Sequence, residues 1–199
     1  MSLKVYRGRT LARSQALQLL FQAEQLDRPL EDVISGDYLI SKGPLNSYAL
    51  ELARGAYEHI DRIDCALQAL SKNWSLARMP GADRNILRIA VWEMRFMTDD
   101  EVSDAVVINE AVELAKAYGT DESSSFINGV LGRIASADEL PGADLYDRML
   151  AEDEARAAAS SEAQDSPATV DGDSSDEALD PPVVSVESDE VVSSEPNGE

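Results

Sequence analysis

The sequence has 199 residues, 44% of them hydrophobic, and a formal net charge of −21 at pH 7. Because no apolar run approaches the roughly 20 residues of a membrane-spanning helix, we expect no membrane association. The single cysteine excludes an internal disulfide, and the N-terminal residues lack the apolar stretch of a secretory leader. These features predict a soluble protein of the cytoplasm.

The charge is distributed unevenly along the chain. Residues 136–199 contain 19 of the 38 acidic side chains and only two arginines, which gives this part a net charge of −17. Residues 1–135 carry 15 lysines and arginines against 19 acidic side chains, a net charge of −4. The overall acidity therefore describes mainly the C-terminal part, and it does not exclude nucleic-acid binding by the rest.

The first 135 residues have the pattern of amphipathic α-helices, because their hydrophobic residues recur at intervals of three and four. A first helix is expected over residues 10–27, and Pro29 ends it. A short second helix is expected over 30–35 and a third over 45–59. A fourth follows directly and ends near residue 73.

Three further helices complete the expected domain. The fifth, over residues 84–97, is the most apolar segment, so we expect it at the centre of the core, with Asp83 as its N-cap. The sixth ends at Gly119, and Asp121 is expected to cap a seventh helix that ends near residue 134. We expect the sixth helix to turn one stripe of residues toward the core: Ile108, Ala111, Val112, Ala115 and Tyr118.

The C-terminal part differs in composition from the domain at residues 1–136. An amphipathic helix is compatible with residues 143–159, so we treat 137–160 as a helical extension. Residues 161–199 are rich in Ser, Asp, Glu, Ala and Pro and contain no aromatic side chain, which predicts a disordered acidic tail. Two roles stay open for this tail, a dispensable solvated extension or a charge mimic that competes with RNA.

The sequence contains no motif of a known catalytic centre. A glycine-rich phosphate loop, a Cys/His set with metal-ligand spacing and a nucleophilic serine elbow are all missing. With one histidine and one cysteine, most pairs of nucleophile and base are excluded. His59 lies at the end of a predicted helix and is better explained as a structural residue than as a catalytic base. We therefore expect no enzyme activity, no cofactor and no bound metal.

The N-terminus is basic, and no acidic residue appears before Glu24. A basic arm that leads into a helix suits single-stranded or irregular RNA, because it neutralises several phosphates at once. The alternative is a solubilising terminus, and charge alone does not decide between the two. The basic side chains of the arm are Lys4, Arg7, Arg9 and Arg13.

Three ordered sequence blocks resemble the signature of the NusB transcription antitermination family. The first is VINEAVELAK at residues 107–116, followed by Tyr118-Gly119, and the second is FINGVL at 126–131. LRIA at 87–90, followed by Trp92-Glu93, and the segment around Ala12-Arg13 add further matches. The resemblance spans about residues 5–136.

This resemblance implies an all-α fold of two three-helix subunits with an RNA-binding N-terminal region, in a domain for which the periodicity predicts seven helices. It also implies a heterodimer with NusE, a small-subunit ribosomal protein. In the family, that heterodimer recognises the single-stranded boxA element of ribosomal RNA leaders and supports processive transcription by the elongation complex.

The resemblance further implies which residues contact RNA. Arg9 and Arg13 match the basic positions of the family, and Lys4 and Arg7 extend them. A second part of the RNA surface is implied at Glu122, Phe126 and Asn128.

The partner-facing surface is implied at Phe21 and Glu93. Structural roles compete with these assignments: Phe126 has the spacing of a core residue, and Phe21 has that of a residue packed on the fifth helix. Glu93, in so apolar a helix, requires a partner inside the domain or across an interface. For Glu110 we favour a structural role, at a helix start or paired with Arg88.

The sequence departs from the family pattern in several places. Phe21 takes a position commonly held by tyrosine, residues 121–125 are rich in serine where a lysine often precedes the phenylalanine, and the acidic tail is additional. Two other functions stay open. One is a non-catalytic domain related to the N-terminal domain of ribosomal RNA cytosine methyltransferases, and the other is a homodimeric interaction domain, with a homodimer as the free form.

Overall fold

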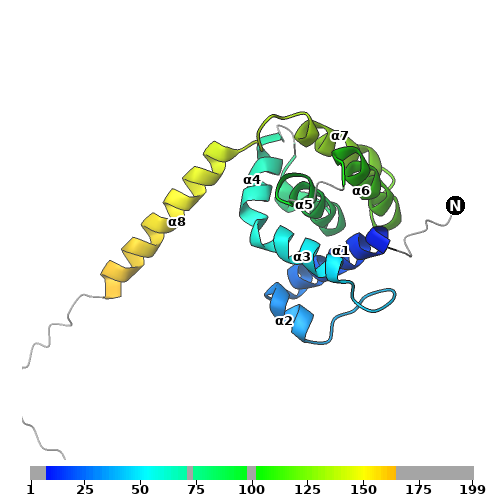
Figure 1. Ribbon diagram of the computed structural model, residues 1–199. Coiled ribbons are helices and arrows are strands. Elements are labelled where there is room, and N and C mark those ends of the chain that lie inside the picture. The colour runs from blue at the N-terminus through cyan, green and yellow to red at the C-terminus, as the bar shows by residue number, and fades with distance from the viewer. Residues whose placement is uncertain (1–7, 71–73, 98–101, 165–199) are drawn as a thin grey trace, which may run out of the picture.

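The computed structural model describes residues 8–70, 74–97 and 102–164, and every regular element in these residues is a helix (Figure 1). The predicted all-α fold is confirmed. No helix of the described part combines the length and hydrophobicity needed to cross a membrane. In chain order the elements are α1 (Gly8–Leu26), α2 (Leu30–Ser35), α3 (Ser47–Glu58), α4 (Ile60–Leu70), the 3₁₀ turn η1 (Leu76–Arg78), α5 (Gly81–Arg95), α6 (Asp104–Tyr118), α7 (Ser123–Ala135) and α8 (Ala143–Gln164).

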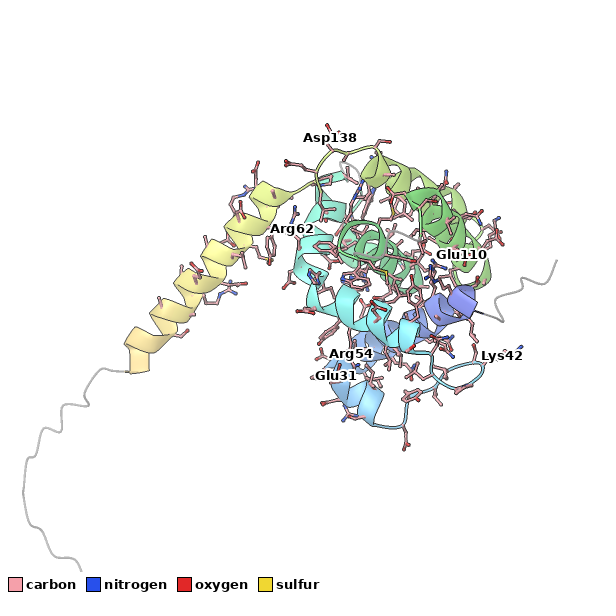
Figure 2. All side chains as sticks on the ribbon, viewed as in Figure 1. Glu31, Lys42, Arg54, Arg62, Glu110 and Asp138 are labelled. Atoms are coloured by element: carbon pink, nitrogen blue, oxygen red, sulfur yellow. The ribbon has the colours of Figure 1, made fainter. Side chains whose placement is uncertain are left out.

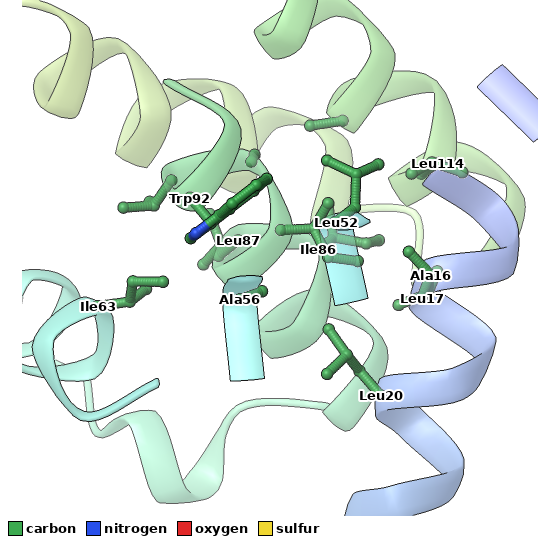
Figure 3. Packing of buried hydrophobic residues seen from close by; sticks show 14 of the residues in the cluster. Ala16, Leu17, Leu20, Leu52, Ala56, Ile63, Ile86, Leu87, Trp92 and Leu114 are labelled. Atoms are coloured by element: carbon green, nitrogen blue, oxygen red, sulfur yellow. The ribbon is translucent and has the colours of Figure 1, made fainter. Parts of the chain in front are cut away.

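Helix α5 lies at the centre of the domain, as its apolar sequence predicted. It packs with α6 and α7 as one three-helix unit, and it also contacts α1 and α3 of the N-terminal half. Burial of the apolar side chains of α5 between the two halves of the domain is the main favourable contribution to the free energy that holds the halves together. Figure 3 shows its residues Ile86, Leu87 and Trp92 among side chains of α1 and α3, namely Ala16, Leu17, Leu20, Leu52 and Ala56.

A glycine permits the close approach of α3 to α5. A Cβ atom added to Gly55 would lie 2.0 Å from the Trp92 ring, a distance at which the two helices would have to separate. The indole ring therefore occupies the space that any other residue at position 55 would fill.

Two helix starts differ from the sequence prediction. Helix α5 begins after Pro80 and not at residue 84, because proline is tolerated where a helix starts, before any intrahelical hydrogen bond needs its missing N–H. Asp83 therefore lies in the first turn of α5, where it accepts a hydrogen bond from Ser123 and caps nothing. Helix α7 has Glu122 and not Asp121 as its N-cap, without a side-chain cap bond. By contrast, Asn46 caps α3, accepting a hydrogen bond from the Tyr48 amide at 2.8 Å.

The inward stripe of α6 is rotated from the predicted one. Its buried residues are Val107, Ala111, Leu114 and Ala115, whereas Tyr118 is exposed. The rotation follows from the position of α6, which packs against α5 and α7 at once and so buries a face between them. The repeat of three and four fixes the width of such a stripe but not its centre.

Helix α8 leaves the domain from the side of α4 (Figure 1). The guanidinium of Arg62 donates to the carbonyl oxygens of Leu140 and Pro141, both at 2.9 Å, and lies over the Tyr146 ring. Gly142 makes the turn with φ +76°, a left-handed conformation that favours glycine. The helical extension is thus anchored at its base, and its residues from 150 to 160 are exposed.

A buried ion pair joins four helices. Arg13 of α1 is 3% exposed and its Nε donates to Glu93 Oε2 of α5 at 2.8 Å, with a second bond from Nη2 to Oε1. Tyr48 of α3 donates its hydroxyl to Glu93 Oε1 at 2.7 Å. Arg13 Nη1 also donates to Glu110 of α6 at 3.3 Å. Although burial disfavours its charged form, the bonds to Glu93 raise the pKa of Arg13 above its ordinary value.

A second polar cluster connects α1, α4 and α5. Arg88 donates to both carboxylate oxygens of Asp64, at 2.9 and 2.6 Å, so it is not paired with Glu110, which was one of the two roles expected for that residue. Its side chain leaves α5 on the α4 side of the helix, whereas Glu110 lies on α6 and is paired with Arg13. Glu24 of α1 accepts hydrogen bonds from Arg84 and Asn85.

The buried pair predicts a large stability effect of a small change. Glu93→Gln leaves the Arg13 guanidinium buried beside a neutral group, so we expect the free energy of unfolding to fall by about 3 kcal/mol in urea titrations. Glu110→Gln removes the same charge from the more exposed end of the network. It should lower the free energy of unfolding by less than about 1 kcal/mol. Equal losses in the two variants would contradict the central place of Glu93.

The same network predicts loss of stability at alkaline pH. Burial, together with the hydrogen bond to Glu93, raises the pKa of Tyr48 above the ordinary tyrosine value of about 10. The contribution of Tyr48 to the free energy of unfolding is complete below about pH 10 and declines above it. The reason is that above this pH the unfolded chain releases the Tyr48 proton while the folded chain keeps it. The unfolding free energy, measured between pH 8 and 11.5, should therefore fall more steeply in the parent than in Tyr48→Phe. Parallel profiles would exclude this linkage.

Candidate nucleic-acid interface

No group of three His, Cys, Asp or Glu residues in the described part of the chain is placed to hold a metal ion. The His59 ring lies 4.5 Å from the Phe96 ring, between centroids, and its Nδ1 is 2.9 Å from the Gly55 carbonyl oxygen. These contacts give His59 a structural role at the end of α3, consistent with its sequence interpretation.

The basic arm enters the domain at the start of α1. Lys4 and Arg7 lie outside the described residues, while Arg9 belongs to the first turn of α1. The Arg9 guanidinium lies over the Tyr48 ring, 5.2 Å from its centroid, and the side chain is partly exposed. A cation–π contact of this kind orients the guanidinium.

Arg13 is not part of an accessible basic surface, contrary to the prediction from the arm. It is nearly inaccessible to solvent and holds two carboxylates, those of Glu93 and Glu110. A phosphate would have to break these bonds to reach it. The position of Arg13 along α1 explains why the prediction was wrong. Arg13 lies one turn further into the helix than Arg9, where α3, α5 and α6 already cover α1.

Two of the three predicted RNA-contacting residues of the second block lie together. Glu122 and Phe126 are one helical turn apart, and both line a cavity between η1, the start of α5 and α7. Asn128 is exposed on another side of α7 and does not line this cavity. The Phe126 ring is partly buried and meets the Trp74 ring edge to face, with centroids 5.3 Å apart.

Sequence reasoning missed the other half of this cavity. Trp74, Arg78 and Asp83 come from the segment before α5 and from its first turn. The sequence signals in this segment were the aromatic side chain of Trp74 and the Pro80-Gly81 pair after it. The Pro-Gly pair predicts a turn, but it does not predict which residues the turn contacts.

A second surface forms around Phe21, whose side chain is 39% exposed. Phe21 lies against the start of α5 at Gly81. It lines a groove of about 290 Å³ with Leu17, Leu39 and Tyr118, and Leu39 and Tyr118 are exposed as well. An exposed apolar cluster of this kind is typical of an interface with another protein.

Three glutamines of α1 hold one wall of this groove in place. Gln22 donates to the Leu39 carbonyl oxygen at 2.7 Å and accepts from the Leu39 amide at 2.8 Å. Gln18 accepts from the Ser41 amide, and Gln15 donates to the carbonyl oxygens of Lys42 and Pro44. The loop that carries Lys42 is visible beside α1 in Figure 2. The glutamine side chains thus supply hydrogen-bond partners for the loop backbone, and they fix the loop against α1.

Glu93 does not lie on the surface that contains Phe21, although both were expected to face a partner. Its carboxylate is buried under Arg13 and Tyr48. Gly81, which Phe21 contacts, is 12 residues before Glu93, or roughly 18 Å along α5. The partner that Glu93 requires is inside the domain.

Comparisons with known proteins agree on one family. The NusB family model matches residues 10–136. The transcription antitermination protein NusB of Salinispora arenicola is 45% identical over 131 residues, which are 64% of this chain and 95% of that protein. The protein of the same name from an Arthrobacter species is 45% identical over 127 residues, covering 64% and 92%.

Solved structures give the same result. Thermotoga maritima NusB superposes with a TM-score of 0.57 at 34% identity, covering 68% of this chain and 94% of that one. A structure of NusB and NusE in complex with double-stranded RNA has a TM-score of 0.50 at 29% identity, covering 62% and 92%. Since the family model accounts for more than half of the sequence and the relatives are matched over nearly their whole length, the chain belongs to the NusB family of non-catalytic transcription antitermination proteins.

Proposed function

We propose that this protein binds single-stranded boxA-type RNA of ribosomal RNA leaders as a heterodimer with NusE, and so keeps the transcription elongation complex processive. The supporting observation is that an aromatic cavity and an apolar groove lie next to each other at the start of α5. A NusB relative of known structure is in complex with NusE and RNA at once. Nascent RNA as the target places the activity in the bacterial cytoplasm.

The proposed RNA surface combines the basic arm with the face of α7. Arg9 supplies a fixed guanidinium beside Tyr48, and Lys4 and Arg7 extend the positive charge. Phe126, with Trp74, supplies aromatic area on which unpaired bases stack. Glu122 borders this area, whereas Asn128 extends the proposed surface on another side of α7. Arg13 acts indirectly, because its bond to Glu93 fixes the acceptor of the Tyr48 hydroxyl.

The proposed NusE surface is the groove at Phe21. Its apolar side chains are already exposed in the monomer, so their burial by a partner is favourable without rearrangement of the domain. The glutamine contacts keep Leu39 in place before binding, which lowers the ordering cost of association. A homodimer of the free protein over this groove would compete with NusE for the same residues.

Replacing Arg9 should weaken RNA binding through charge. In Arg9→Ala we expect a lower affinity for a boxA-type oligonucleotide and a salt dependence shallower by about 0.7 in log Kd against log salt, since one phosphate contact is lost. Anisotropy titrations at several salt concentrations measure both. Arg54→Ala is the matched control, because Arg54 is exposed and paired with Glu31, away from the proposed surface (Figure 2). An unchanged slope in Arg9→Ala would remove Arg9 from the RNA surface.

Replacing Phe21 should weaken NusE binding through lost apolar contact. We expect Phe21→Ala to raise the Kd for purified NusE at least about tenfold, as for an aromatic side chain at the centre of an interface. Leu26→Ala, an exposed apolar change in the same helix outside the groove, should bind like the parent. Calorimetry with both variants, after thermal melting shows that they fold, makes the comparison. If the two variants bind NusE equally, the groove is not the interface.

A further inference from the structure

The cavity beside Phe126 has the size of a small-molecule site. Its volume is about 440 Å³, within the range of roughly 300–1,000 Å³ that holds drug-sized ligands. Its walls come from three elements that are distant in sequence, namely η1, the first turn of α5 and the start of α7. The side chains on which its chemistry depends are Trp74, Arg78, Asp83, Glu122, Ser123 and Phe126.

Asp83 contributes a buried acceptor to this cavity that the fold does not use. The residue is 4% exposed, and its Oδ2 accepts a hydrogen bond from Ser123 Oγ at 2.7 Å. Ser123 in turn accepts one from the Thr120 amide at 2.8 Å, so the serine hydroxyl is fully engaged. Asp83 Oδ1 has no hydrogen-bond partner among the described residues. A buried carboxylate oxygen left unpaired is costly, so a donor brought by a ligand would be strongly favoured.

The remaining walls favour a flat, neutral ring over a phosphate. Trp74 and Phe126 meet edge to face, and both aromatic side chains line the cavity. Asp83 and Glu122 outnumber the one cation, Arg78, so the cavity repels an anion. A nucleobase that carries hydrogen-bond donors satisfies all these conditions.

The chemistry of a carboxylate selects among the four bases. Guanine presents two adjacent donors on its Watson–Crick edge, N1–H and the N2 amino group. One matches the unpaired Asp83 Oδ1, and the other matches the second lone pair of Oδ2, which already accepts from Ser123. In adenine and cytosine the amino group is next to a ring nitrogen with a lone pair, which the second oxygen repels. In uracil the single N3–H is between two carbonyl oxygens. Guanine is therefore the base that Asp83 accepts best.

We propose that this cavity is a guanine pocket, in which Asp83 accepts hydrogen bonds from the base edge and Trp74 and Phe126 stack on its ring. The inference rests on the proposed RNA binding and adds a base preference to it. Because Asp83 Oδ1 is shielded from solvent in the free protein, side chains that line the cavity, Trp74 among them, must shift as the base enters. The fluorescence of Trp74 therefore reports entry, while Trp92 remains buried.

The test replaces one carboxylate oxygen of Asp83 by an amide group. Asp83→Asn keeps an oxygen for the Ser123 hydroxyl and turns the unpaired acceptor into an amide donor. The full chain and the variant are titrated with four uridine hexamers that have guanosine, inosine, adenosine or cytidine at one central position. We expect the parent to prefer guanosine over adenosine and cytidine by about tenfold, to bind inosine at an intermediate level, and to lose this preference in Asp83→Asn. Asp121→Asn removes the same charge from a nearby position outside the cavity and should keep the preference.

Other outcomes would overturn the proposal in distinguishable ways. If all hexamers bind the parent equally, RNA binding stands and the guanine pocket does not. If Asp83→Asn weakens all hexamers alike, or lowers the melting temperature as its only effect, Asp83 is structural. Saturable binding of an arginine-rich peptide that Asp83→Asn abolishes, with RNA binding intact, would assign the cavity to a protein. If no hexamer binds at any salt concentration, the proposed RNA function fails and the pocket fails with it.

Discussion

The buried pair of Arg13 and Glu93 is the constraint on which the rest of the domain depends. Isolated charges at this depth would be strongly unfavourable, so α1 and α5 must meet in the one register that brings the two groups together. That register also fixes Tyr48, whose hydroxyl has Glu93 as its acceptor, and with it the ring under Arg9. The buried pair of Arg13 and Glu93 therefore fixes the position of Arg9, and with it the point at which the basic arm joins the domain.

The same register places the two proposed surfaces next to each other. At the start of α5, Ala82 lines the groove around Phe21 and Asp83 lines the cavity around Phe126. At the end of α6, Tyr118 lines the groove and Thr120 lines the cavity. A partner that orders one surface therefore acts on the backbone that forms the other. Any such coupling is reciprocal, so RNA would strengthen partner binding by the factor by which the partner strengthens RNA binding.

Periodicity predicted all seven helices of the domain, because an amphipathic helix leaves a repeat of apolar residues that can be recognised in the sequence. It did not predict what the charged residues do. Arg13 and Arg9 are alike as sequence, yet one is buried and the other partly exposed, and this difference depends on contacts 80 and 97 residues away. Phe21, Glu122 and Phe126 were placed from family resemblance and do lie at cavities. Asp83 was assigned to a helix cap, since its true neighbour, Ser123, is 40 residues distant.

The acidic C-terminal part lies beyond the residues that match the family, and the structure bears on how its charge acts. Arg62 anchors α8 on the α4 side, and Figure 1 shows this helix running away from the domain, while α1 begins on another side. A helix of 22 residues is roughly 33 Å long. The Debye length at physiological salt is about 8 Å, so charges beyond the end of α8 are screened from the basic arm unless the chain turns back. The spacer also lengthens the loop that such a return must close, but the cost of closing a loop rises by only about 0.6 kcal/mol for each doubling of its length, so the position of α8 is compatible with both roles of the tail.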